Sequence, residues 1–177
     1  MYCAHLVGKS ILILNYEEAR RVYEMGYFGE TTLVAKPRSF EFDSPLELSP
    51  YDALYLMEQD VLKVKNGNVE MSPEELKQLA SSWIHGFNEK WIVYKDLRRR
   101  GFIVRSGLKF GGTFVVYRYG PGLEHAPFIV DVISGEGISS VDIVRAGRLA
   151  TSVRKVFVIA NVQDGKVEYF LFKWWGI

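Results

Sequence analysis

The sequence predicts an α+β fold in two parts, a small N-terminal α+β domain over residues 1–85 and a C-terminal α/β domain with a central mixed sheet over residues 86–177. Three observations support this prediction. Short apolar runs alternate with helix signals in the first half, whereas runs rich in Val, Ile, Phe and Tyr follow one another in the second half. A length of 177 residues leaves room for one domain or two small ones.

Two apolar runs flank Gly8-Lys9-Ser10 near the start of the chain and predict a β-hairpin over residues 3–14. Asn15 is a good helix N-cap, because its side chain can accept hydrogen bonds from the first free backbone N–H groups, and it predicts a helix through Met25. Residues 35–50 carry three prolines and show little periodicity, so we expect them to form a loop.

Ser49 with Pro50 predicts the start of a second helix, because proline is favoured at the first helical position, and this helix is expected to run to residue 59. A hairpin with a two-residue Asn66-Gly67 turn is expected over residues 61–71.

A third helix is predicted where Ser72 and Glu75 form a capping box. It continues, or restarts, to Arg100, because aromatic and apolar residues recur at spacings of three and four. This stripe consists of Trp83, Phe87, Trp91, Tyr94 and Leu97. Residues 98–100 are expected to be a solvated helix end, and Gly101 ends the helix.

The remaining chain is predicted to be mostly strands, because its apolar runs are short and rich in β-branched and aromatic residues. One helix interrupts them over residues 140–151, capped by Ser139 or Ser140. The expected strands cover residues 102–105, 108–110, 113–119, 128–133, 155–162 and 167–174.

The net charge of +1 conceals opposite charges in the two halves. Residues 1–85 carry 8 Lys and Arg against 13 Asp and Glu, a net charge of −5, whereas residues 86–177 carry 14 against 8, a net charge of +6. This asymmetry favours a polyanionic partner for the second half, or an acidic and a basic surface that meet.

The composition also excludes several classes of protein. The single cysteine, Cys3, rules out an internal disulfide, and three widely spaced histidines form no metal-ligand pattern, so we expect no metal and no cofactor. No apolar run approaches the roughly 20 residues that span a bilayer, and no signal peptide is recognised. The expected location is cytoplasmic, with no membrane partner.

Two groups of polar residues could carry chemistry. Asp131 and Glu136 could hold a metal ion, although carboxylates at strand ends are more often simply solvated. Tyr117, His125 and Lys155 lie at strand ends or in a loop, where catalytic side chains concentrate. Taken singly, each of these three also fits an ordinary structural role, as a half-buried Tyr, a loop His and a solvated Lys.

The segment YKDLRRRGFIVRSGLKFGGTFVVYRYGPGLEHAPFIVDV, followed by RLATSVRK and the closing VEYFLFKWW, resembles the archaeal tRNA-splicing (tRNA-intron) endonucleases over essentially all of residues 85–177. In the first half, SPYDALYLMEQDVLKV (residues 49–64) is similar to the N-terminal domain of those enzymes. The resemblance implies metal-independent cleavage of precursor tRNA at intron–exon junctions, in a bulge-helix-bulge motif. The products would carry 2′,3′-cyclic phosphate and 5′-hydroxyl ends.

By this resemblance Tyr117 matches the catalytic base, His125 the catalytic acid, and Lys155 the cation that stabilises the phosphorane. An unperturbed tyrosine, with a pKa near 10, is ionised only about one part in a thousand at pH 7. Tyr117 therefore needs cationic neighbours, for which Lys155 and Arg118 are candidates, or it mainly positions the nucleophile.

The resemblance also implies substrate contacts and a partner chain. Arg148 matches an arginine that stacks on a bulged base, and the second stacking position falls on Trp174. Residues 35–48 resemble the additional loop of the crenarchaeal two-subunit enzymes, so we expect Lys36 or Arg38 to contact RNA. The chain is expected to be the catalytic subunit of an α2β2 heterotetramer with a structural paralogue, with a homotetramer as the alternative.

In such assemblies the last strand pairs across one interface, and an acidic loop, here residues 163–165, inserts into a basic cleft of another subunit. A single acidic residue in that loop favours the heterotetramer over self-pairing subunits. Two other classes of function stay open from the residues. One is a non-catalytic structural or RNA-binding subunit of the same assembly, and the other is a metal-dependent nuclease that uses Asp131 and Glu136.

Overall fold

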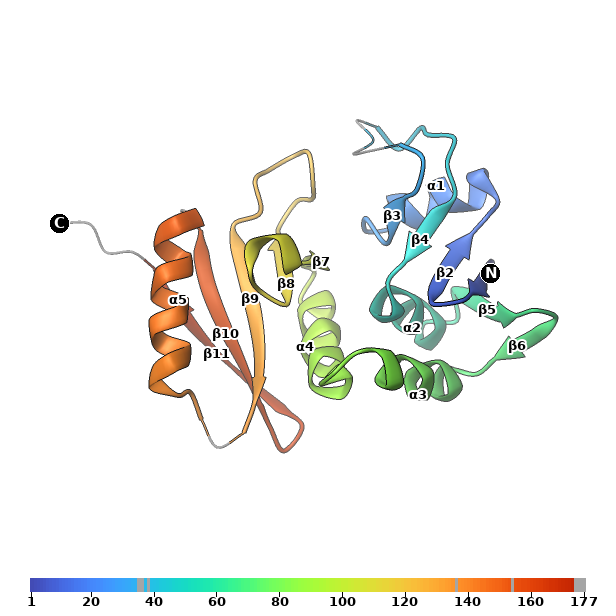
Figure 1. Cartoon of the computed structure of the whole chain (residues 1–177). Helices are drawn as coiled ribbons and strands as arrows, with labels where there is room; N and C mark the ends of the chain where they lie inside the picture. Colours follow the sequence, from blue (N-terminus) through green and yellow to red (C-terminus); the bar gives the residue numbers. More distant parts are fainter. Residues whose placement is uncertain (35–36, 38, 136, 154, 174–177) are drawn as a thin grey trace. The chain divides into compact units, whose positions relative to one another are not determined.

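The computed structural model describes residues 1–34, 37, 39–135, 137–153 and 155–173. The chain divides into two compact units, Met1–His85 and Gly86–Ile177, each with its own sheet (Figure 1). The predicted α+β class is confirmed, because helices accompany a mixed sheet in both units. Among the described residues, no helix combines the length and the apolar character that crossing a membrane requires.

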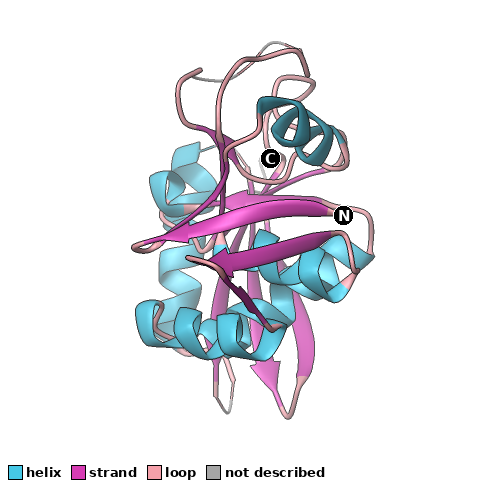
Figure 2. Ribbon diagram, turned by 90° about the vertical axis from the view of Figure 1, so that its right-hand side faces the viewer, coloured by secondary structure: helices cyan, strands magenta, loops and turns pink. Residues whose placement is uncertain are grey.

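The described part of the first unit forms a mixed six-stranded sheet in the order β3-β4-β2-β1-β5-β6. Figure 2 draws the strands in magenta and the helices in cyan. β1 pairs in parallel with β5, and the other neighbouring strands are antiparallel. The strands are β1 Tyr2–Val7, β2 Ser10–Ile13, β3 Glu30–Thr31, β4 Leu46–Leu48, β5 Leu62–Asn66 and β6 Val69–Met71. The helices are α1 Tyr16–Glu24, α2 Pro50–Glu58 and α3 Pro73–Trp83.

Helices in this unit begin where the cap residues predict. The Asn15 side chain accepts hydrogen bonds from the backbone N–H groups of Glu17 and Glu18. Ser49 and Ser72 each form a capping box with the acidic residue three positions later. Side chains thus satisfy N–H groups that have no partner inside the helix, which is why local sequence was sufficient to place these ends.

Two predictions in the first unit were wrong in detail. Residues 35–50 are not only loop, because β4 lies within them and pairs with both β2 and β3. Its two leucines, Leu46 and Leu48, are buried, so burial in the sheet outweighs the weak local signal of a three-residue strand. The second hairpin turns one residue later than predicted, because Asn66 pairs with Val69 and Gly67 takes the positive φ of 59°.

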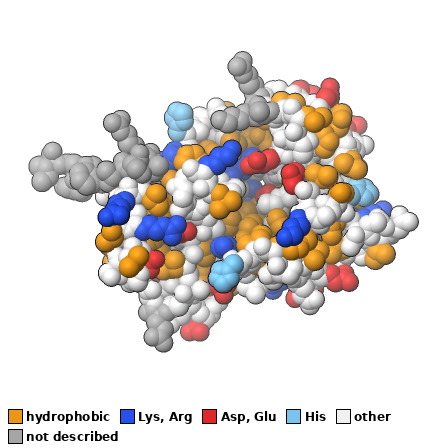
Figure 3. Space-filling view, in the orientation of Figure 1, with side chains coloured by type: hydrophobic (Ala, Val, Ile, Leu, Met, Phe, Trp, Pro, Cys, Tyr) orange, Lys and Arg blue, Asp and Glu red, His pale blue; other side chains and the backbone are white. Residues whose placement is uncertain are grey.

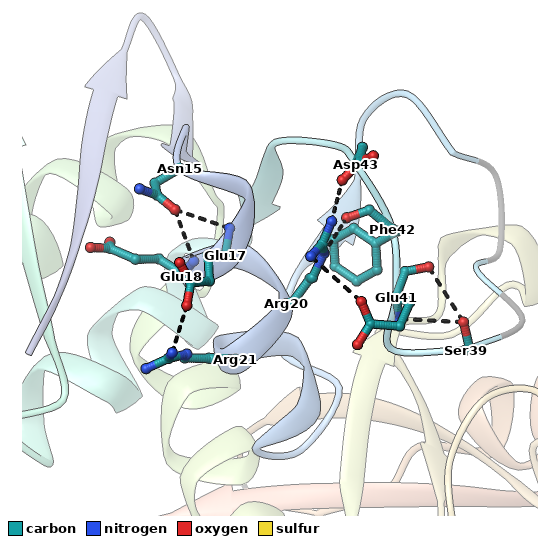
Figure 4. A network of polar contacts seen from close by, with 9 residues as sticks. All are labelled: Asn15, Glu17, Glu18, Arg20, Arg21, Ser39, Glu41, Phe42 and Asp43. Carbon is teal, nitrogen blue, oxygen red and sulfur yellow. Dashed lines mark hydrogen bonds and ion pairs between the residues drawn. The ribbon is translucent and has the colours of Figure 1, made fainter.

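A polar network attaches the connection between β3 and β4 to helix α1 (Figure 4). The Arg20 guanidinium donates through Nε to the carbonyl of Phe42 at 2.7 Å and pairs with the carboxylates of Asp43 and Glu41. Phe42 in turn packs edge-on against Tyr23, which is also on α1. One helix therefore holds the described segment 39–43 by both polar and aromatic contacts.

The described part of the second unit forms a five-stranded sheet in the order β11-β10-β9-β8-β7 (Figure 1). β9 and β10 run parallel, and the remaining neighbours are antiparallel. The strands are β7 Ile103–Ser106, β8 Phe114–Tyr117, β9 Phe128–Ser134, β10 Val156–Gln163 and β11 Lys166–Phe172. The helices are α4 Phe87–Arg99 and α5 Ser140–Val153, with a 3₁₀ turn, η1, over Leu108–Phe110.

The two helices cover opposite faces of this sheet (Figure 1). Tyr94 of α4 contacts Phe114 on one face, whereas Ala146 of α5 belongs to a buried cluster with residues of the other face. That cluster contains Val115, Ala126, Ile129, Ala146, Phe157 and Ile159. Alternation along each strand therefore assigns every sheet residue to the α4 face or to the α5 face.

The structure decides one open alternative in the second unit and corrects two predictions. Of the two alternatives for the aromatic helix, it restarts rather than continues, because Gly86 adopts a left-handed conformation between α3 and α4. Residues 108–110 form a 3₁₀ turn instead of a strand, since Gly107 accepts hydrogen bonds from Phe110 and Gly112. Gly107 has no space for a Cβ, which would lie 2.6 Å from the backbone of Phe114. Close backbone approach at this glycine thus overrides strand propensity.

The helix end at residues 98–100 is only partly solvated, contrary to expectation. Arg98 is buried, and its guanidinium donates to the hydroxyl of Tyr94 at 2.9 Å and to the carbonyl of Val104 at 3.3 Å. Arg100 is exposed and pairs with Asp96 at 2.8 Å. Arg98 can be buried because its donors meet oxygen acceptors, whereas an unpaired guanidinium in this place would be costly.

Candidate active site

Three neighbouring strands, β8, β9 and β10, have ends that lie side by side at one end of the second unit's sheet. Val116 of β8 pairs with Phe128 of β9, and Phe128 pairs with Val156 of β10. Tyr117 is one residue beyond this row and ends β8, and Lys155 is one residue before the row and immediately precedes β10. Two strand spacings thus separate the Tyr117 and Lys155 backbones, about 10 Å in all.

Tyr117 and Lys155 also project from the same face. Val115, two residues before Tyr117 on β8, belongs to the buried cluster under α5, and side chains two residues apart in a strand point in the same direction, so Tyr117 lies on the α5 face. The Lys155 ammonium contacts Ala126, which belongs to the same cluster. Tyr117 packs against this cluster and is half-buried.

The Lys155 ammonium is held in place by two contacts. Its Nζ donates a hydrogen bond to the carbonyl of Ala126 and lies 5.7 Å from the centroid of the Phe110 ring. An ammonium has three N–H donors, and the hydrogen bond to the Ala126 carbonyl uses one of them. The other donors can bind an anionic ligand. Phe110 belongs to the η1 turn, which explains how an apparent strand residue comes to contribute to the site.

His125 lies in the long loop between β8 and β9, the yellow-orange segment of Figure 1. Its side chain is exposed, and both of its chain neighbours accept hydrogen bonds from other residues. The preceding residue, Glu124, accepts backbone hydrogen bonds from Arg118 and Tyr119, the two residues that follow Tyr117. The following residue, Ala126, accepts the hydrogen bond from Lys155. His125 is therefore tied on one side to the end of β8 and on the other to the start of β10.

Arg118 does not join this group. It follows Tyr117 directly, so strand alternation directs it to the α4 face, and its guanidinium carbon lies 5.2 Å from the centroid of the Phe128 ring. Of the two cations expected to act on the Tyr117 hydroxyl, only Lys155 shares its face of the sheet.

Arg148 is exposed on α5, on the border of an open hollow. Gly111, which follows Phe110, lies on the same hollow, so this surface continues from the surroundings of Lys155. Apolar side chains of α5 are exposed here as well, and Figure 3 shows Lys or Arg side chains beside hydrophobic ones over this helix. A basic and apolar surface of this composition suits a nucleobase better than a small anion.

Asp131 is occupied by contacts within the protein. Its carboxylate accepts a hydrogen bond from the Thr113 hydroxyl at 3.0 Å and pairs with Arg145 at 3.1 Å, and Arg145 also donates to the carbonyl of Gly111 at 2.9 Å. Its proposed partner Glu136 lies outside the described residues. Within the described ranges, no three His, Cys, Asp or Glu side chains form a group that could hold a metal ion. Asp131 thus anchors α5 to the sheet.

Three predicted substrate contacts, Lys36, Arg38 and Trp174, lie outside the described residues. Conversely, sequence reasoning assigned no role to Glu124, to the Ala126 carbonyl or to the Phe110 ring. Glu124 stands next to His125 in the Glu-His pair of the loop, and this adjacency was the only signal for it. The other two contacts depend on the register of β9 and β10 and carry no local signal.

Both halves of the chain match known families. A family model described as "tRNA intron endonuclease, catalytic C-terminal domain" matches residues 87–169, and one described as "tRNA intron endonuclease, N-terminal domain" matches residues 2–77. Similar proteins include tRNA-splicing endonucleases of Hyperthermus butylicus, with 45% identity, and Saccharolobus islandicus, with 41%, both over 98% of each chain. That of Sulfurisphaera tokodaii is 40% identical over 96% of each chain. The chain therefore belongs to the tRNA intron endonuclease family.

Proposed function

We propose that this protein is the catalytic subunit of a tRNA-splicing endonuclease, which cleaves precursor tRNA at intron–exon junctions. The proposal draws on the family and on the name that its relatives share. The observation that supports it most directly is the placement of Tyr117, His125 and Lys155 around one edge of one sheet. These residue types together can remove a proton, deliver a proton and stabilise a negative charge.

The reaction is an in-line transesterification that needs no metal ion. Tyr117 removes the proton of the ribose 2′-hydroxyl, or orients that hydroxyl, and the 2′-oxygen then attacks the adjacent phosphorus. His125 delivers a proton to the 5′-oxygen as the P–O5′ bond breaks. The products are a 2′,3′-cyclic phosphate and a 5′-hydroxyl, so the protons balance without water entering the step.

Lys155 supplies the positive charge that a metal ion provides in other nucleases. A pentacoordinate phosphorane carries one more negative charge than the starting diester, and a fixed ammonium stabilises it most strongly where water is excluded. The Ala126 carbonyl and the Phe110 ring hold Nζ in position before the substrate arrives. Such pre-positioning avoids reorganisation at the moment of reaction.

The substrate is a bulge-helix-bulge RNA, whose unpaired bases must be held outside the helix. Arg148, exposed beside an apolar hollow, is proposed to stack on one of these bases. Trp174 is proposed as the second stacking side chain, and Lys36 or Arg38 as an RNA contact in the N-terminal loop. Stacking on such side chains is worth about 1–3 kcal/mol per base.

The assembly proposed is an α2β2 heterotetramer with a structural paralogue, and a homotetramer is the alternative. β11 is an edge strand of the described sheet, and its Phe170 and Leu171 are 40% and 65% exposed. An exposed apolar edge of this kind is typical of a strand that pairs with another chain. The turn after β10 consists only of Asp164 and Gly165, so it offers a single carboxylate to a basic cleft of a partner.

The test is cleavage of a bulge-helix-bulge RNA in excess EDTA, by the protein alone and after co-expression with candidate partner chains. The expected result is two cuts with cyclic phosphate and 5′-hydroxyl ends, identified by end-group analysis. Cleavage that EDTA abolishes would instead indicate a metal-dependent nuclease. Absence of cleavage with every partner would indicate a non-catalytic RNA-binding subunit. The mass of the purified complex distinguishes the two tetramers.

A further inference from the structure

The loop between β8 and β9 is closed by one of its own carboxylates. Oε1 of Glu124 accepts hydrogen bonds from two successive backbone N–H groups, those of Arg118 and Tyr119, the second at 2.6 Å. Consecutive N–H groups that converge on one point form an anion-binding concavity, and a carboxylate is a natural occupant. Hydrogen bonds to a charged acceptor are also about twice as strong as neutral ones.

The backbone of this loop is shaped to bring the carboxylate back to the strand end. The Gly120 carbonyl accepts hydrogen bonds from the N–H groups of Leu123 and Glu124, each at 3.3 Å. Gly120 and Gly122 have φ of 127° and 89°, which residues with a side chain rarely adopt. The turn is therefore set by its glycines, and the Glu124 side chain closes it against β8.

Glu124 connects the segment that follows Tyr117 to His125, two of the three proposed catalytic residues. Its hydrogen-bond donors begin immediately after Tyr117, and Glu124 itself immediately precedes His125. Movement of the Glu124 backbone would shift the imidazole relative to the tyrosine hydroxyl, because no flexible residue intervenes on the histidine side. On the other side, the Ala126 carbonyl bound by Lys155 limits the same movement.

We propose that Glu124 is a positioning residue for cleavage, which sets the distance between the Tyr117 hydroxyl and the His125 imidazole by binding the two backbone N–H groups that follow Tyr117. This inference rests on the proposed function, because it assumes that these two side chains act on the same scissile phosphate. Glu124 does not contact RNA in this role. Its loss should lower the rate of the chemical step and leave substrate affinity unchanged.

The test compares Glu124→Ala, Glu124→Asp and Glu124→Gln with the wild type in the full-length assembly. The single-turnover rate constant at saturating bulge-helix-bulge RNA should fall about 10- to 100-fold for Glu124→Ala, since a misplacement of about 1 Å can cost that much. Glu124→Asp should behave similarly, because its side chain is one methylene too short. Glu124→Gln retains an acceptor oxygen at the same reach and should recover most of the rate. Glu74→Ala, which removes an exposed glutamate of α3, is the control.

Two further measurements separate positioning from a general structural role. RNA affinity and the melting temperature should change little in any of the Glu124 variants. The inference is overturned if Glu124→Ala cleaves at the wild-type rate, if Glu124→Gln is as slow as Glu124→Ala, or if the loss of rate accompanies an equal loss of affinity or folding.

Amide hydrogen exchange provides a measurement that does not depend on activity. The Arg118 and Tyr119 amides should exchange at least 10-fold faster in Glu124→Ala than in the wild type, and close to the wild-type rate in Glu124→Gln. If these two amides exchange at the wild-type rate in Glu124→Ala, the inference is overturned, whatever the cleavage activity of the variant. A wild type that does not cleave refutes the proposed function, and with it the assignment to catalysis, whereas accelerated exchange in that case would still show that Glu124 holds the loop.

Discussion

The β8–β9 connection and the β3–β4 connection are both long, but the protein fixes them in different ways. In the β8–β9 loop, a carboxylate of the loop binds backbone N–H groups of the same loop. In the β3–β4 loop, a guanidinium on α1 binds a backbone carbonyl and two carboxylates of the loop (Figure 4). The first arrangement is local in sequence, and the second depends on packing against a helix.

This difference relates to what each loop has to do. Under the proposed function, the loop that carries His125 has to hold this side chain relative to Tyr117 and Lys155, so a contact at the strand ends is the most direct constraint. The β3–β4 loop is instead held along residues 39–45. Ser44, which is fully buried, accepts a hydrogen bond from the N–H of Leu33 at 2.9 Å, and Phe42 packs on Tyr23. Its described part is thus bound to the first unit as a whole.

The charges of the two units follow the same division. Acidic side chains of the first unit are largely used within it, for example Glu41 and Asp43 with Arg20, and Glu70 with Lys63. In the second unit, Arg148 is exposed and Lys155 faces the candidate site. Ion pairs contribute no net charge, so the net charge of −5 lies on the other carboxylates of the first unit, whereas the net charge of +6 in the second unit includes cations that a polyanion can reach.

The largest effect is expected for His125→Ala. Loss of a general acid lowers the rate of the chemical step about 10²- to 10⁴-fold. Because His125 is exposed, the free energy of unfolding should stay within about 0.5 kcal/mol of the wild type. Single-turnover cleavage and denaturant unfolding measure the two quantities, and His85→Ala, another exposed histidine, is the control. Full activity of His125→Ala would show that the β8–β9 loop does not carry a catalytic side chain, and the proposed functional difference between the two loops would be wrong.

Two glycine substitutions should show that the two connections differ in how tightly they are packed. Gly29, which leads into β3, has a φ of 75°, and a Cβ there would lie 2.8 Å from the carbonyl oxygen of Glu47. Gly29→Ala should therefore lower the free energy of unfolding by about 2–4 kcal/mol, from backbone strain and overpacking together. Gly122 has a φ of 89° but open space around it, so Gly122→Ala should cost only about 1–2 kcal/mol. Equal losses in denaturant unfolding would contradict this account.

Arg20→Ala should weaken the β3–β4 connection by about 1–2 kcal/mol, because one guanidinium serves a carbonyl and two carboxylates. Arg20→Lys should not restore the loss, since a single ammonium cannot reproduce a planar fork of donors. Arg21→Ala on the same helix removes only an exposed pair with Glu17 and should cost less than about 0.5 kcal/mol. Amide exchange over residues 39–43 should accelerate in the Arg20 variants alone.

The smallest effect is expected at the start of α5, where Ser139 exchanges hydrogen bonds with Asp142. Ser139→Ala should cost about 1 kcal/mol at pH 7. The side-chain and backbone hydrogen bonds of Ser139 lower the pKa of the Asp142 carboxyl. The ionised Asp142 carboxylate therefore contributes its full stabilisation of the folded state above the unfolded-state pKa, which is near 4. This stabilisation is lost as the pH falls through the lower folded-state pKa. Denaturant unfolding at pH 7 and pH 2.5 should show the difference from the wild type shrinking at the lower pH.

Several features could be predicted from the sequence because their causes are local. Three helices are capped through residues no more than three positions away, by Asn15, Ser49 and Ser72. The starts of these helices could therefore be predicted from adjacent residues in the sequence. The motif residues that carry the family resemblance lie in continuous segments, and the family was identified correctly from them. The roles of Tyr117 and Lys155 within that family stay proposals.

Other features were missed because their causes are not local. β4 is only three residues long and follows a proline, yet it forms because Leu46 and Leu48 are buried against neighbouring strands. Arg98 was expected in solvent, and its burial depends on acceptors supplied by Tyr94 and by β7. Phe110 reads as a strand residue, but the close approach of Gly107 to Phe114 folds it into a turn beside Lys155.

The sequence by itself determined the helix starts, the two-part α+β organisation and the family, because caps, periodicity and motifs are properties of short segments. Only the tertiary structure decided which side chains meet at the candidate site. Tyr117 and Lys155 are 38 positions apart, and they share one edge and one face because β9 pairs with β8 on one side and in parallel with β10 on the other. A register shift of one residue would turn the side chains of β10 to the opposite face and displace Lys155, which immediately precedes it, because side chains alternate along a strand.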